Sequence, residues 1–162
     1  MAFTAWEFIR GALMAILYFN LLTMLVFGVT TGGFGLLFAP FWSVPWSFGA
    51  AIVLGPTVVL PVAVLLRRTR SRTGHALVYA GLGLVVGIVV SAVGAQTGWA
   101  FVGPAPASGA GFWQRVSAYS FSIIVVTIDS AIAVPAGWYW SMRRARRDDT
   151  RPNGRAQLPS PA

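Results

Sequence analysis

The sequence has few of the residue types on which catalysis and metal binding depend. It contains no cysteine, one histidine and 4 acidic residues among 162. Without cysteine there is no disulfide framework, no thiolate nucleophile and no cysteine-based metal or iron–sulfur site. One histidine and no pair of carboxylates at catalytic spacing form neither a metal-binding motif nor an acid–base pair. We therefore expect a protein that is not an enzyme and that carries no metal and no cofactor.

Charged residues are also scarce, and the basic ones are all arginine. The 12 arginines give a net charge of +8, yet charged residues make up only 10% of the chain, against about 25% in soluble domains. The arginines stand at the ends of apolar segments instead of sharing a face with polar residues, so we expect no nucleic-acid partner. The use of arginine without lysine is typical of a GC-rich genome, and we expect a bacterial source.

Long uncharged stretches fill most of the chain. Hydrophobic residues make up 56% of it, and the mean hydropathy is +0.70. A helix that crosses a bilayer needs about 20 mostly apolar residues. The pattern predicts an all-α, polytopic membrane protein with a bundle of four transmembrane helices, followed by a basic and disordered tail over 143–162. The expected helices span residues 11–29, 47–66, 75–97 and 118–142.

The arginines also predict the orientation of this bundle. Short loops rich in arginine remain on the cytoplasmic side of a membrane. With both termini and the 67–72 turn in the cytoplasm, only Arg115 lies on the outer side. We therefore expect a multi-pass protein of the bacterial plasma membrane, N-in and C-in. The arginines that determine this topology also predict contact with anionic lipids at the cytoplasmic face, and they are Arg67, Arg68, Arg70, Arg72, Arg143, Arg144, Arg146 and Arg147.

Glycine and proline interrupt the apolar segments at several points. Because both residues break helices, the sequence predicts loops over 30–46 and 98–117. The aromatic residues of 30–46 favour a loop that lies in the membrane interface, and a re-entrant segment is the alternative. Pro56 and Pro61 lie inside the second expected helix and predict kinks, because proline lacks an N–H and clashes with the preceding turn.

Small residues recur every four positions along the third expected helix. Gly83, Gly87, Ser91 and Ala95 form a smooth ridge of the small-xxx-small type, which lets two helix backbones approach closely. The ridge predicts a packing surface for another helix, either within the chain or in a second copy.

Two polar residues fall near the centre of the expected bundle. Asp129 lies fourteen positions before Arg143, about 21 Å along a helix, and Asn20 lies at a similar depth. An ionised carboxyl at that depth costs about 2.5–3.5 kcal/mol on insertion scales, so Asp129 needs a partner or a function. A structural Asp129 would hydrogen-bond to a carbonyl freed by Pro56, or to Asn20. A functional Asp129, with Asn20, would bind a proton or a cation.

These observations leave two functions open. The first, which we favour, is an accessory, assembly or oligomeric membrane subunit that acts through helix packing without catalysis, as a homo-oligomer or in a larger membrane complex. The second is a small proton- or cation-coupled transporter or channel that uses Asp129 at the bilayer midplane. The scarcity of reactive side chains favours the first.

Overall fold

The computed structural model describes residues 5–66, 71–97 and 106–150, and of Ala5, Arg72 and residues 145–150 it describes the backbone alone. These residues form helices and no strand, which confirms the all-α class for the described part of the chain. The helices are α1 (Ala5–Thr30), α2 (Phe34–Leu54), the π-helical segment η1 (Gly55–Val59), α3 (Leu60–Leu66), α4 (Arg72–Thr97), α5 (Phe112–Ala118) and α6 (Ser120–Thr150). Four apolar spans are long enough to cross a membrane, as predicted: Trp6–Thr30, Phe34–Leu66, Thr73–Thr97 and Ser120–Arg144.

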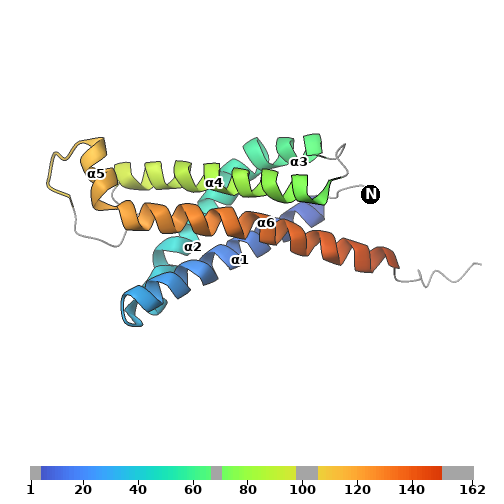
Figure 1. The fold of residues 1–162 in the computed structure, drawn as a ribbon, viewed down its shortest axis with the longest axis horizontal. Coiled ribbons are helices and arrows are strands. Elements are labelled where there is room, and N and C mark those ends of the chain that lie inside the picture. The colour runs from blue at the N-terminus through green and yellow to red at the C-terminus, as the bar shows by residue number, and fades with distance from the viewer. Residues whose placement is uncertain (1–4, 67–70, 98–105, 151–162) are drawn as a thin grey trace, which may run out of the picture.

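The long helices form an elongated bundle (Figure 1). α4 and α6 run side by side along its length, and α1 and α2 cross them obliquely. α6 packs closely against both α4 and α1, α1 packs against α2, and α2 touches α4 much less. We call the end that holds Arg10 and Arg143 the basic end. The loop end is the opposite one, with the 31–33 turn and α5.

α2 begins at Phe34, so the prediction of a loop over 30–46 and a helix from 47 is wrong. The chain reverses within a turn at 31–33, where Gly32 and Gly33 have φ angles of 63° and 94°. Glycine adopts these left-handed angles without the steric penalty of a side chain. The two glycines therefore act as predicted breakers, but over a much shorter segment.

Two prolines inside α2, Pro40 and Pro45, account for most of this error. A proline inside an isolated helix costs about 3 kcal/mol, which is why the sequence favoured a loop. Here α2 presents buried small residues to α1, and a Cβ on Gly35 would overlap the backbone carbonyl of Phe27. α2 nevertheless continues through both prolines while it packs closely against α1. The buried residues of this face recur every four positions: Gly35, Ala39 and Ser43.

The predicted kink site Pro56 falls in η1. The N–H of Leu60 donates to the carbonyl of Gly55, five residues back, and the α-helical pattern is therefore interrupted there. Nearby, the Thr57 hydroxyl donates to the carbonyl of Val53 at 2.6 Å. The second predicted kink site, Pro61, is the second residue of α3, which continues directly from η1.

The fourth long helix extends beyond its predicted end. α6 continues from Ser120 to Thr150, so the prediction that a disordered tail begins at 143 is wrong for 143–150. Arginine and alanine are good helix formers, which favours continuation of the helix through Arg-Arg-Ala-Arg-Arg at 143–147. Residues 151–162 lie outside the described part. A short helix, α5, also forms within the predicted loop 98–117.

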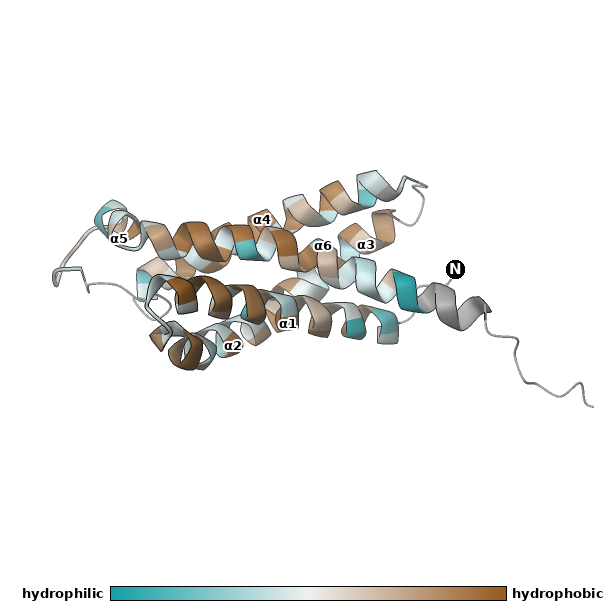
Figure 2. Ribbon diagram, turned by 60° about the horizontal axis from the view of Figure 1, so that its bottom comes forward, coloured by the Kyte–Doolittle hydropathy of each residue, from teal (hydrophilic) through white to brown (hydrophobic). Residues whose placement is uncertain are grey.

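Apolar side chains line the outside of the bundle, and polar ones are buried within it. Phe41, Leu65 and Ile52 are 81%, 74% and 71% exposed. Figure 2 shows apolar colouring along α1, α2, α4 and α6, and polar colouring where α6 leaves the bundle at the basic end. The buried polar residues are Asn20, Thr23, Ser43, Ser91, Ser122, Asp129, Ser130 and Ser141.

Candidate functional site

Asp129 lies at the contact between α6 and α1. Its carboxyl accepts a hydrogen bond of 2.9 Å from the hydroxyl of Thr23, Oγ1 to Oδ2. Asp129 is 3% exposed and Thr23 is fully buried, so this hydrogen bond is shielded from the surroundings of the bundle. Small residues make the close approach of α1 and α6 possible: a Cβ on Gly137 would lie 2.7 Å from the backbone nitrogen of Ala15.

Asn20 joins α1 to α2. The Ser43 hydroxyl donates to Asn20 Oδ1 at 2.6 Å, and Asn20 Nδ2 donates to Ser47 Oγ at 3.1 Å. Asn20 Nδ2 also donates to the carbonyl of Ile16 at 2.8 Å. The carboxamide therefore uses both hydrogens and its oxygen, and it connects two helices through side chains that are otherwise in apolar surroundings.

The sequence found the two central polar residues but not their partners. It predicted that Asp129 pairs with Asn20 or with a carbonyl freed by Pro56, and the structure places Thr23 there instead. Asn20 and Thr23 are one turn apart on α1 but serve different neighbours, α2 and α6. Ser43 and Ser47 are four residues apart, which places them on one face of a helix. This pattern was not used because the sequence predicted a loop over 30–46.

The predicted ridge on α4 faces α6. A Cβ on Gly83 would overlap the carbonyl of Ser130, and one on Gly87 would lie 2.7 Å from the Cα of Thr127. Ser91 and Ala95, further along the ridge, are 1% and 0% exposed. Within the described chain the ridge is therefore occupied by α6.

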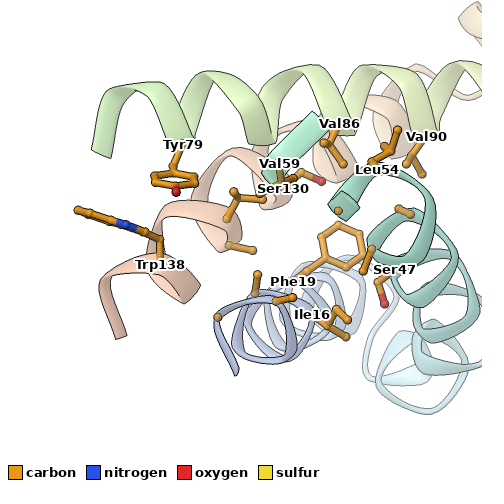
Figure 3. Close-up of a pocket in the computed structure, with 18 of the residues that line it drawn as sticks. Ile16, Phe19, Ser47, Leu54, Val59, Tyr79, Val86, Val90, Ser130 and Trp138 are labelled. Carbon is orange, nitrogen blue, oxygen red and sulfur yellow. The ribbon is translucent and has the colours of Figure 1, made fainter. Parts of the chain in front are cut away.

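A half-open cavity of about 140 Å³ lies between α1, α2, α4 and α6, with η1 at its side. In Figure 3 the labelled side chains of Phe19, Val86, Val90 and Leu54 converge on it from different helices. Its surface is almost entirely apolar. Ser130 contributes to the lining, whereas Asp129 does not.

Aromatic residues and arginines meet at the basic end. His75 and Tyr79 of α4 stack on Trp138 of α6, with ring centroids 5.4 and 5.3 Å apart. On α6 the guanidinium of Arg143 lies 4.7 Å from the ring centre of Tyr139. Arginine also lies over tryptophan with the same four-residue spacing, Arg10 over Trp6 at 4.9 Å and Arg144 over Trp140 at 5.5 Å. This end therefore presents cations beside flat apolar rings.

The remaining predicted arginines are only partly described. Arg143 and Arg144 are exposed on α6. Arg67, Arg68 and Arg70 lie outside the described residues, as do the side chains of Arg72, Arg146 and Arg147.

At the loop end, Arg115 of α5 donates to the carbonyl of Gln96 at 2.9 Å and to that of Ala110 at 3.0 Å. It thereby caps one of the last carbonyls of α4, and a cation there suits the negative end of the helix dipole.

The chain matches no family model, no curated protein and no solved structure. Within 5–66, 71–97 and 106–150 there is no group of three or more histidine, aspartate or glutamate side chains placed to hold a metal ion.

Proposed function

We propose that the chain is a multi-pass protein of the bacterial plasma membrane that crosses the bilayer four times, with both termini in the cytoplasm. The distribution of side chains supports this location, because it is the reverse of that in a soluble protein. Large apolar residues point outward along the four spans, and polar residues are buried inside the bundle. In lipid an exposed leucine or phenylalanine costs nothing, whereas an exposed hydroxyl or carboxyl has no water to bind. The arginines at the basic end favour the cytoplasmic side for that end.

Within the membrane the protein acts through helix packing, as an accessory, assembly or oligomeric subunit and not as a catalyst. One observation carries this proposal: the central polar side chains are engaged with one another across helix contacts, Thr23 with Asp129 and Asn20 with Ser43 and Ser47. Hydrogen bonds between membrane helices contribute about 0.6 kcal/mol on average and up to about 1.7 kcal/mol. Two such contacts fix the rotation of α1 relative to both of its neighbours.

The mass of the protein in native-lipid discs tests this role. A single chain has a mass of 17.3 kDa. We expect discs that hold a homo-oligomer or a larger complex, and the same assembly for Asp129→Asn, because an asparagine oxygen still accepts the hydrogen bond from Thr23. Discs that contain one isolated chain would contradict the proposal.

A second function, transport of protons or cations through Asp129, is favoured by one feature of the site. Among the described residues Asp129 has a hydroxyl as its hydrogen-bond partner and no arginine beside it. A carboxyl without a cationic partner inside a membrane is a typical ion or proton site. This function predicts that Asp129→Asn abolishes ion flux into liposomes while the protein remains abundant and assembled. Unchanged flux would leave the packing role alone.

A further inference from the structure

The cavity has the surface and the volume of a site for hydrocarbon. Its volume of about 140 Å³ is close to that of the apolar cavity of about 150 Å³ that binds benzene in another protein. A whole helix does not fit, because a helix with its side chains is about 10–12 Å wide. This excludes a helix from a second copy and leaves a narrow, flexible molecule as the occupant.

The lining residues are distributed along the helices, so the cavity is elongated. On α1 the lining extends from Glu7 to Phe19, and on α4 from Tyr79 to Val90. The two stretches cover twelve and eleven positions, about 18 and 16 Å along a helix axis. The cavity thus runs from the basic end toward the centre of the bundle, in the direction that an acyl chain takes from the membrane surface.

Two arginines of the basic end are close in sequence to residues that line this cavity. Arg10 directly precedes the lining residue Gly11, and Arg144 follows the lining residue Ser141 by three positions on α6. Both guanidinium groups lie over tryptophan rings within 5.5 Å. Arginine is well suited to bind phosphate oxygens. The lining also includes the carboxylate of Glu7, one turn before Arg10. Because this carboxylate repels a phosphate, binding of a phosphate depends on the positive charge of the arginines.

We infer that the cavity holds a segment of one acyl chain of an anionic phospholipid, and that the phosphate of this lipid binds Arg10 and Arg144. The inference rests on the proposed membrane location and goes beyond general contact with the bilayer, because it assigns one lipid to one site. The apolar walls select a hydrocarbon chain, and the cations at the basic end select a negative headgroup.

Native mass spectrometry of the full chain tests the site. Delipidated protein in a nonionic detergent is titrated with phosphatidylglycerol and, separately, with phosphatidylcholine of the same acyl chains. Ala51→Phe places a ring in the lining of the cavity, and Val53→Phe adds the same ring at an exposed position of the same helix. Ala12→Leu, on the α1 wall, is the second cavity variant if Ala51→Phe does not fold.

We expect one phosphatidylglycerol per chain, bound with at least about tenfold lower affinity by the cavity variant, because displacing two methylene groups suffices for that factor. Val53→Phe retains the affinity of the unmodified chain. Arg10→Gln combined with Arg144→Gln removes the preference for phosphatidylglycerol over phosphatidylcholine. Three results would overturn the inference. The cavity variants could bind lipid as tightly as the unmodified chain, the unmodified chain could bind both lipids equally, or it could retain detergent alone. Recovery of the chain from the membrane fraction is scored separately, so failure of the lipid site is distinguishable from failure of the proposed location.

Discussion

The contact between α4 and α6 at Gly83 allows a quantitative test of the packing. Replacing Gly83 by alanine adds a Cβ that would overlap the Ser130 carbonyl oxygen and lie 2.9 Å from its carbon and 3.0 Å from the Cα of Ala131. These are backbone atoms, so no side-chain rotation relieves the overlap and the two helices have to separate. Adding a methyl group to a closely packed contact typically costs about 1–3 kcal/mol.

Gly81 on the same helix is the matched control. A Cβ at Gly81 meets no atom within 4 Å, and Gly81→Ala therefore changes helix propensity without changing the packing. Both variants gain the same propensity, about 0.8–1.0 kcal/mol. The difference between their free energies of unfolding then equals the packing term, and we expect Gly83→Ala to be less stable than Gly81→Ala by about 1–3 kcal/mol.

The comparison is made by unfolding each variant in mixed micelles with increasing amounts of a denaturing detergent, followed by far-ultraviolet circular dichroism. Equal stability of Gly83→Ala and Gly81→Ala would refute the reasoning, because it would mean that α4 and α6 do not meet at Gly83.

Three further changes test other contacts of the bundle. Asn20→Val leaves the hydroxyls of Ser43 and Ser47 without their interhelical partner, and the same unfolding assay should show a loss of about 1–2 kcal/mol; an unchanged stability would contradict the α1–α2 hydrogen bonds. Arg115→Gln removes the cap from the end of α4, so amide hydrogen exchange should accelerate in its last turn and not at its centre. Trp138→Leu loses two aromatic stacks and should destabilise the chain by about 0.5–1.5 kcal/mol per stack beyond the lost apolar area, whereas Trp140→Leu loses only its contact with Arg144 and should cost less.

The four membrane-length segments could be predicted from the sequence because their signal is length and composition. An uncharged apolar run of about 20 residues has few alternatives to a helix. The same reasoning failed at Pro40 and Pro45, because propensity treats each proline in isolation. Whether a helix continues through them depends on the surrounding structure, and here α2 packs against α1 through buried small residues.

The partner of Asp129 could not be predicted, for a related reason. Depth along the membrane normal, counted from Arg143 for Asp129 and from Arg10 for Asn20, places the two residues at similar levels. Which residues meet also depends on how each helix is rotated, and rotation follows from small-residue contacts such as Gly137 against Ala15. Thr23 is one turn from Asn20, yet it faces α6 instead of α2. The ridge of Gly83 and Gly87 was visible because its spacing is a local property of one helix.

The extent of the fourth long helix could not be predicted from composition alone. The sequence predicts a basic, disordered tail over 143–162, because the residues beyond the arginine run offer almost no apolar surface to bury. The described part of α6 nevertheless extends to Thr150, since helix propensity in Arg-Arg-Ala-Arg-Arg is high and no proline occurs before Pro152.

The central claim is that Asp129 serves helix packing through its hydrogen bond with Thr23, and a double-mutant cycle tests it most directly. The free energies of unfolding of the unmodified chain, Thr23→Val, Asp129→Ala and the double variant are measured in the same micelles. If the hydrogen bond holds α1 to α6, the two single changes are coupled by about 0.6–1.7 kcal/mol. Effects that add within about 0.3–0.5 kcal/mol would contradict the claim, because they would show that the two side chains do not act on each other.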